Sequence, residues 1–199
     1  STLMPRAQGD VLLETPVVRG PDIVPAVEDR SYVAFIGGAM LMALGGGFVL
    51  AVAASLAGAG VAWTDRGPWL TQAHGAAQLQ GWAGLFVAGM AFRLLPRFAG
   101  RRPFPRWLNL GTFVLLFSGV VLRTVAQPMA GTAFSEAALF AGQALWSAGA
   151  VVIAAVVGVT LLRGRGRGQA WHAFALAGAA WWAAWAVAAL ASGVRGARH

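Results

Sequence analysis

The residue best able to do chemistry in this chain is His74, which lies inside the apolar segment TQAHGAAQLQGWAGLFVAGMAFRLLPRFAG at 71–100. On an α-helix, His74, Gln78 and Gly81 fall on one stripe, and Gly89 lies near its continuation. An imidazole followed by positions without side chains suits a flat ligand that packs against the helix. These residue types match haem, whose iron takes an axial imidazole nitrogen and whose propionates pair with arginine.

The same stripe also has a purely structural interpretation. Gly81, Gly84 and Gly89 would let neighbouring helices approach closely, and His74 would hydrogen-bond across the helix contact. Polar residues within a membrane span nevertheless indicate a functional site by default. Spacing alone therefore leaves both interpretations open.

Other side chains could complete a haem site. Arg123 could bind a propionate or Glu136, or extend to the membrane surface. Met129, in the loop AQPMAG, could supply a second axial ligand, since His/Met ligation occurs in cytochromes. A loop methionine more often serves packing, so this role is a weaker expectation than that of His74.

Two further groups of residues have structural and functional interpretations. Gln143 and Ser147 are four residues apart, a spacing more typical of a polar contact between helices than of a ligand site. Trp181, Trp182 and Trp185 could stack on a pigment or a quinone, but contact with lipid or with a partner is the commoner role.

The composition places all these residues in a membrane. The 199 residues are 58% hydrophobic and 11% charged, whereas a soluble domain carries roughly a quarter charged residues. The absence of cysteine excludes disulfides, iron–sulfur clusters and thiolate metal sites. The net charge of +8 does not indicate a nucleic-acid partner, because the arginines gather in short loops between apolar segments.

The apolar segments predict membrane-spanning helices, because backbone polar groups cannot remain unpaired in lipid and about twenty residues cross the hydrocarbon. The expected fold is an all-α integral membrane protein, a bundle of five transmembrane helices within 31–194. Residues 1–30 are expected to form an extended N-terminal tail, and 195–199 a short C-terminal one. The five predicted spans are 33–60, 71–95, 107–126, 134–162 and 170–193.

The positions of the arginines orient this bundle. Five of them lie between the second and third spans, and three lie between the fourth and fifth: Arg93, Arg97, Arg101, Arg102 and Arg106, then Arg163, Arg165 and Arg167. The positive-inside rule places both loops, and the N-terminus, in the cytoplasm and the C-terminus outside. His74 and Arg123 then lie at similar depths near the outer surface. All fifteen basic residues are arginine, which we interpret as coding bias, and we expect a bacterial inner membrane.

The stretch from His74 onwards resembles the second transmembrane helix of haem–copper oxidase subunit I and its relatives, the C-type oxidases, the nitric oxide reductases and the NnrS family. The shared pattern is a histidine near the outer end, Gly81 seven residues later, Gly89 fifteen later, Pro96 twenty-two later and then a basic turn. The resemblance covers 71–106 and, in layout, the first four spans.

This resemblance implies that His74 is an axial ligand of a low-spin, b-type haem. The NnrS proteins carry a second histidine where this chain has Ala76. Members of these families have many more spans and take further ligands from them. His172 is expected on the cytoplasmic side, about 30 Å from His74, and His199 is terminal. A second axial ligand would come from Met129, from a second copy or from a partner subunit.

We therefore expect a haem-associated membrane protein, a shortened oxidase-like or NnrS-like module for electron transfer or gas sensing. The missing ligands make a complete enzyme improbable. The alternative is a non-catalytic scaffold or accessory subunit of a larger respiratory or photosynthetic complex that has lost the cofactor. The expected partners are the lipid bilayer and other membrane subunits or a second copy of the chain, and no nucleic acid.

Overall fold

The computed structural model describes residues 30–164 and 169–196, and within these ranges every regular element is a helix. The first continuous helix comprises α1 (Tyr32–Leu41), a π-helical stretch η1 (Met42–Phe48) and α2 (Val49–Gly58). We refer to it as the α1–α2 helix. Tyr32–Gly58 together make 27 residues, enough to cross the hydrocarbon of a membrane.

A second continuous helix follows the short 3₁₀ turn η2 (Thr64–Arg66). It comprises α3 (Gly67–Ala76), the π-helical η3 (Ala77–Gly84) and α4 (Leu85–Phe98), and we refer to it as the α3–α4 helix. Three further long helices complete the fold. These are α5 (Arg106–Ala126), which is extended by the 3₁₀ turn η4 (Gln127–Met129), then α6 (Ala133–Arg163) and α7 (Ala170–Gly196).

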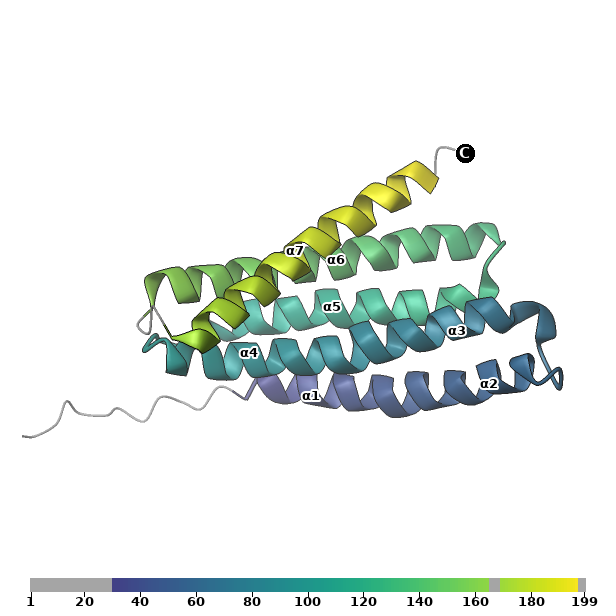
Figure 1. Cartoon of the computed structure of the whole chain (residues 1–199), viewed down its shortest axis with the longest axis horizontal. Coiled ribbons are helices and arrows are strands. Elements are labelled where there is room, and N and C mark those ends of the chain that lie inside the picture. Colours follow the sequence, from purple (N-terminus) through teal and green to yellow (C-terminus); the bar gives the residue numbers. More distant parts are fainter. Residues whose placement is uncertain (1–29, 165–168, 197–199) are drawn as a thin grey trace, which may run out of the picture.

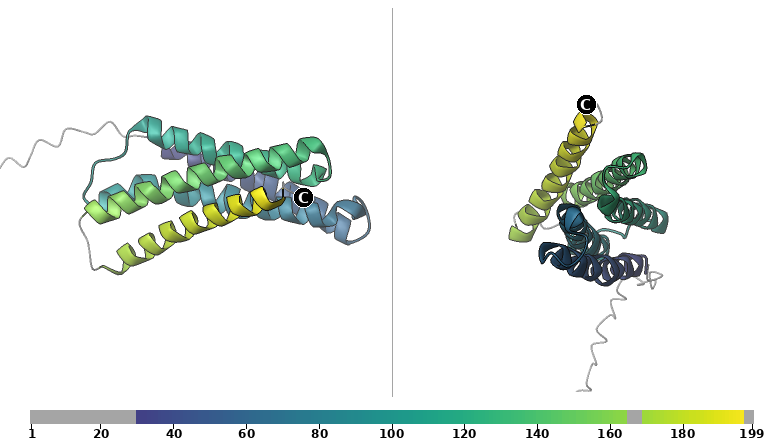
Figure 2. Two further views of the ribbon diagram at one scale, coloured as in Figure 1. Left: turned by 90° about the horizontal axis from the view of Figure 1, so that it is seen from above. Right: turned by 90° about the vertical axis from the view of Figure 1, so that its right-hand side faces the viewer.

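Successive helices run in opposite directions, as Figure 1 shows. One end of the bundle carries the start of α1, the connection 99–105, the end of α6 and the start of α7. The other end carries the connections 59–66 and 130–132. In the end-on view of Figure 2, α7 leans away from the other helices.

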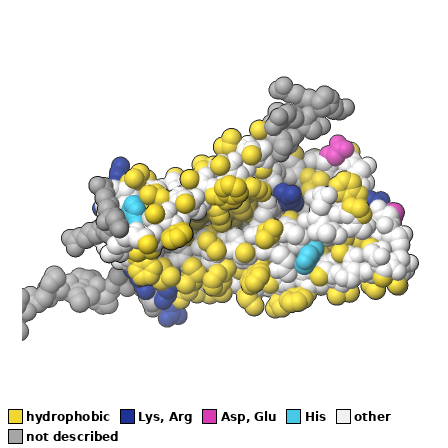
Figure 3. All heavy atoms as spheres, in the orientation of Figure 1, with side chains coloured by type: hydrophobic (Ala, Val, Ile, Leu, Met, Phe, Trp, Pro, Cys, Tyr) yellow, Lys and Arg dark blue, Asp and Glu magenta, His cyan; other side chains and the backbone are white. Residues whose placement is uncertain are grey.

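Four of these helices are long and apolar enough to cross a membrane: Tyr32–Gly58, Arg106–Met129, Ala133–Arg163 and Ala170–Ala191. This pattern indicates a membrane protein. Hydrophobic side chains cover much of the bundle along its length in Figure 3. The α3–α4 helix is equally extended but is more polar, because it carries three glutamines and a histidine in its first half, and Arg93 and Arg97 in its second.

Helices α5 and α6 approach each other closely at a pair of glycines. A Cβ atom on Gly119 would lie 2.7 Å from the carbonyl oxygen of Gly142, and one on Gly142 would lie 2.8 Å from that of Gly119. Close backbone approach at such small residues is typical of helices that pack in a membrane. The core continues beside this crossing through Leu116, Val120 and Trp146, all buried. This close crossing sets the spacing of α5 and α6, and it thereby sets where the polar side chains farther along both helices lie.

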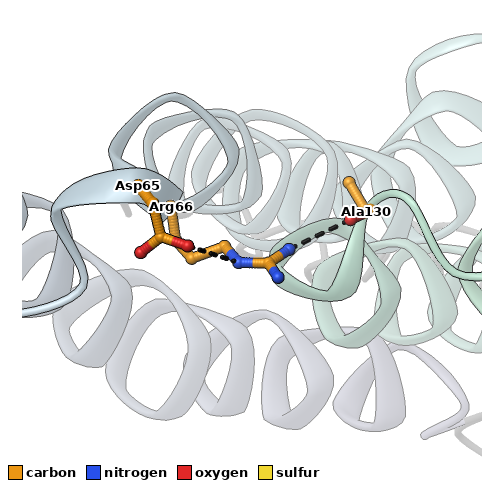
Figure 4. Close-up of polar contacts among 3 residues, drawn as sticks. All are labelled: Asp65, Arg66 and Ala130. Atoms are coloured by element: carbon orange, nitrogen blue, oxygen red, sulfur yellow. Dashed lines mark hydrogen bonds and ion pairs between the residues drawn. The ribbon is translucent and has the colours of Figure 1, made fainter.

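A polar contact ties together the two connections at one end of the bundle. The guanidinium of Arg66 donates from Nη1 to the carbonyl oxygen of Ala130 at 3.0 Å, and its Nε lies 3.3 Å from Oδ2 of Asp65. Figure 4 shows how Arg66 reaches from η2 to the loop after η4. The start of α3 is therefore held against the end of α5.

At the opposite end, the guanidinium of Arg93 stacks on the ring of Tyr32, with its Cζ 4.0 Å from the ring centroid. The α3–α4 helix ends where Gly100 takes φ +62°, a conformation that glycine adopts without strain. The amide of Arg101 then donates to the carbonyl of Pro96 at 2.7 Å. Several expectations lie outside the described residues, namely the tail 1–29, Arg165, Arg167 and 197–199.

Candidate functional site

The ring of His74 is half-buried where the two π-helical stretches η1 and η3 meet. Its Nδ1 lies 2.9 Å from the carbonyl oxygen of Gly47. A carbonyl can only accept, so Nδ1 carries the proton and donates it. Gln78 lies against the same glycine, because a Cβ on Gly47 would collide with the Gln78 amide. The predicted pairing of His74 with Gln78 on one face is therefore present.

The glycines of the predicted stripe face the same neighbouring helix. A Cβ on Gly81 would lie 2.7 Å from Cβ of Met42, and a Cβ on Gly89 would lie 2.6 Å from Cβ of Phe35. The stripe is thus filled by the α1–α2 helix. A flat ligand could lie along it only if that helix moved away.

The hydrogen bond of His74 still has a chemical consequence. Histidines that bind metals commonly donate their second ring N–H to a backbone carbonyl, which fixes the tautomer and leaves the other nitrogen able to bind. With Nδ1 donating to Gly47, Nε2 is the free nitrogen, and it has no hydrogen-bond partner among the described residues. No group of three or more His, Cys, Asp or Glu side chains gathers in the described part of the chain.

A cleft of about 360 Å³ opens on another side of the α3–α4 helix, toward α5, α6 and α7. We call it the tryptophan cleft. It combines aromatic rings with two glutamines and one arginine, and no carboxylate of the described residues lines it. Its lining residues are Gln72, Gly75, Ala76, Leu79, Gln80, Arg123, Trp146, Trp181, Trp182 and Trp185.

Arg123 reaches this cleft from the last turn of α5. Its Nη1 donates to Oε1 of Gln143 at 2.6 Å, and Nε2 of Gln143 donates to Oγ of Ser147 at 2.9 Å. Gln143 and Ser147 therefore form the polar contact that their spacing predicts. The arginine is bound by an amide rather than by Glu136, which is exposed in the first turn of α6.

Three of the residues that line the tryptophan cleft each carry a buried polar atom without a hydrogen-bond partner in the described structure. These atoms are Oε1 of Gln80, Nε of Arg123 and Nε1 of Trp146. Gln80 is 9% exposed and Trp146 is 5% exposed, so bulk water scarcely reaches these two side chains. Leaving a buried polar group unpaired costs about 1–3 kcal/mol. Because the three residues line one hollow, a ligand there could complete the hydrogen bonding of these atoms after small shifts of the side chains that cover them.

Tryptophans form the walls of the cleft. The ring centroids of Trp146 and Trp185 are 4.6 Å apart in an edge-to-face arrangement, and those of Trp146 and Trp182 are 5.4 Å apart. Trp181 turns outward and is 72% exposed. A concave, mainly apolar site with a few convergent polar groups is the usual form of a small-molecule site.

The structure divides the residues predicted for one haem site between two places. His74, Gln78, Gly81 and Gly89 face the α1–α2 helix, whereas Arg123 lies in the tryptophan cleft. Met129 lies in η4 and is 45% exposed, and no described contact of its sulfur joins it to either place. His172 begins α7, and its Nε2 lies 3.0 Å from the carbonyl oxygen of Leu161.

Sequence reasoning missed three residues of the cleft, Gln72, Gln80 and Trp146. The two glutamines lie within the same polar segment as His74 and were detectable as further polar residues in an expected span. Trp146 lies between Gln143 and Ser147 in the sequence, where nothing distinguishes it from a packing residue. Its position depends on how α6 meets α7.

Comparison of the chain with protein-family models, with curated proteins and with solved structures found no match. A functional proposal therefore rests on the geometry around His74 and in the tryptophan cleft.

Proposed function

We propose that this chain is an integral membrane subunit that binds a flat, oxygen-bearing cofactor in the tryptophan cleft. The observation that carries this proposal is the set of three unpaired, buried polar atoms on Gln80, Arg123 and Trp146. Two of them are N–H donors, which suit a carbonyl or carboxylate oxygen of the ligand. The third is an acceptor for a hydroxyl.

The charge of the cleft supports the same class of ligand. The guanidinium of Arg123 stays protonated in proteins, and no carboxylate of the described residues lines the cleft. A cation at membrane depth is costly unless it is paired or reaches water. An electron-rich oxygen beside Nε would compensate this charge, and the indole rings would hold a planar ring by stacking.

The proposal includes the arrangement in the membrane. The α3–α4 helix lies antiparallel between helices that are apolar enough to cross, and its length matches theirs (Figure 1), so we count it as a fifth crossing. The exposed Arg97, Arg101, Arg102 and Arg106 all lie toward the end where α1 begins. The positive-inside rule makes this end cytoplasmic in a bacterial inner membrane. The tryptophan cleft then lies in the outer half of the bilayer.

Haem bound through His74 is the second candidate, favoured by the hydrogen bond from Nδ1 to Gly47. His74 fits the role of an axial ligand. The glycine stripe does not fit the predicted role of holding the macrocycle, because Met42 and Phe35 fill it. The macrocycle would have to lie at the outer edge of His74. Its second ligand would come from a partner subunit or from His74 of a second copy.

Ligand extraction tests the cleft. The protein is purified in mild detergent, and its organic extract is analysed by mass spectrometry for a stoichiometric small molecule. We expect one in wild type and in Arg106→Gln, an exposed position at the far end of α5, and its loss in Arg123→Gln. Trp146→Phe removes the indole donor while keeping a ring and should lower occupancy severalfold. Equal amounts of the extracted molecule in wild type and both cleft variants would refute the proposal that it binds in the cleft.

A reduced-minus-oxidised spectrum of the same preparation tests haem. The second candidate predicts a b-type band that His74→Ala abolishes and His172→Ala retains. Both substitutions remove an imidazole that contacts a backbone carbonyl, so a general loss of folding would affect both. A stoichiometric complex with other subunits that contains neither haem nor an extracted ligand would favour the scaffold expected as the alternative.

A further inference from the structure

A second hollow, of about 400 Å³, lies between α4, α6 and α7. We call it the apolar groove. All of the side chains around it are apolar, and it lacks any titratable or amide group. It is lined by Phe86, Val87, Met90, Ala91, Leu94, Leu95, Phe98, Ile153, Val157, Phe174, Ala175, Gly178, Ala179 and Trp182.

The groove continues the tryptophan cleft along the same helices. The cleft is lined by residues within 72–80 of the α3–α4 helix, and the groove is lined by residues within 86–98. On α7 the cleft takes 181–185 and the groove 174–182, so Trp182 lines both. From Gln80 to Phe98 the helix rises about 27 Å. One elongated molecule could therefore lie with one end in the cleft and the other in the groove.

We infer that the cofactor of the tryptophan cleft is a lipid-soluble quinone, with its ring in the cleft and its hydrocarbon tail in the apolar groove. This inference rests on the proposed function and adds the chemical class and the orientation of the ligand. The quinone carbonyl oxygens accept from Nε of Arg123 and Nε1 of Trp146, once these buried atoms turn toward the cleft as the ring enters. In the reduced form, a hydroxyl donates to Oε1 of Gln80. The two donors on Arg123 and Trp146 are thus used in both redox forms, and the acceptor on Gln80 only in the reduced form.

The shape of the two hollows favours a quinone over the other amphiphiles of a membrane. A diacyl phospholipid brings two chains and a tetrahedral phosphate, whereas the structure offers one groove and a cleft walled by indole rings. Haem is flat but has no long chain to occupy the groove. A quinone combines a flat ring that stacks on tryptophan with a single tail.

A tail competes with lipid for the groove, because lipid chains are as apolar as its walls. The affinity of a tailed quinone alone therefore does not show where its tail lies. A bulky side chain placed in the groove would block the tail and so locate it. Gly178 lines the groove, and a Cβ there would meet nothing within 4 Å. Gly111 on α5 is also exposed with nothing within 4 Å and lies outside both hollows. Gly178→Phe and Gly111→Phe are therefore matched variants.

The experiment measures quenching of tryptophan fluorescence in nanodiscs of palmitoyl-oleoyl phosphatidylglycerol. Two probes are titrated, a tail-less dimethoxy-benzoquinone and the same ring with a long isoprenoid tail. We expect Gly178→Phe to weaken the tailed probe at least tenfold and to leave the tail-less probe within twofold of wild type. Gly111→Phe should bind both probes as wild type does. Comparing the two variants therefore corrects for partition of the probes into lipid.

The outcomes separate the two proposals. If Gly178→Phe leaves the tailed probe unchanged while Arg123→Gln weakens both probes, the ring lies in the cleft but the tail does not lie in the groove. This inference then fails, and the proposed function survives. If neither probe binds wild type saturably, the quinone assignment fails, and the extraction described above decides separately whether the cleft holds another ligand. If the extract contains only phospholipid, both proposals fail.

Discussion

Arg123 and Gln143 are joined across the α5–α6 contact by a hydrogen bond of 2.6 Å from Nη1 to Oε1. The close approach of Gly119 and Gly142 makes this possible, because it brings the two backbones together one turn before the arginine. Gln143 is held in turn by Ser147. The pair fixes the guanidinium so that its Nε remains unpaired at the tryptophan cleft.

The first prediction concerns this pair. Gln143→Leu should lower the free energy of unfolding by about 1–2 kcal/mol, since polar contacts between helices in a membrane contribute about this much. Unfolding in mixed detergent and dodecyl sulfate, followed by circular dichroism, measures the change. Ser118→Ala is the control, because its hydroxyl bonds only to the carbonyls of its own helix. An equal effect of both substitutions would contradict a special role for Arg123–Gln143.

The second prediction separates stability from binding. Oε1 of Gln80 has no partner in the described structure, so Gln80→Leu should stabilise the ligand-free protein by about 1 kcal/mol and weaken ligand binding. Gln72→Leu should destabilise instead, because Oε1 of Gln72 accepts from Nε2 of Gln127 at 2.8 Å. Thermal melting of extracted, ligand-free protein checks both signs. A destabilised Gln80→Leu would show that this amide already has its partner.

The third prediction concerns the glycine stripe. Gly81→Ala places a methyl 2.7 Å from Cβ of Met42, and overpacking of this kind costs about 1–3 kcal/mol. Gly37→Ala meets nothing within 4 Å and should be neutral. Adding Met42→Ala to Gly81→Ala should not restore the loss, because alanine keeps the Cβ atom that the new methyl meets. The same unfolding assay measures all three variants, and equal stability of the two glycine variants would mean that the helices do not pack here.

The fourth prediction concerns the orientation in the membrane. The chain has no cysteine, so a single introduced thiol gives an unambiguous signal. Thr64→Cys lies in η2, at the end with the few charges, and Arg102→Cys lies in the arginine-rich connection. In intact cells, a membrane-impermeant maleimide should label Thr64→Cys, and Arg102→Cys only after lysis. The reverse labelling pattern would show the opposite orientation in the membrane, with the tryptophan cleft in the inner half of the bilayer.

Helix positions were predictable because each is a local property of the chain. The apolar segments matched the helices to within a few residues. The α3–α4 helix runs on through Pro96 and ends at Phe98, three residues beyond the predicted end of that span at residue 95. The face shared by His74, Gln78, Gly81 and Gly89 also followed from the helical period. That face was predicted to hold either a flat ligand or another helix, and in the structure the α1–α2 helix packs against it.

The sequence by itself determined that this is an all-helical chain with the character of a membrane protein, because hydropathy and helix formation depend on neighbouring residues along the chain. Only the tertiary structure decided which polar residues meet. Arg123 joins Gln80 and Trp146, contributed by three different helices, and not His74. Such meetings depend on where small residues let helices approach and on how far α7 leans outward. Both are properties of packing between distant segments, which no spacing within one segment records.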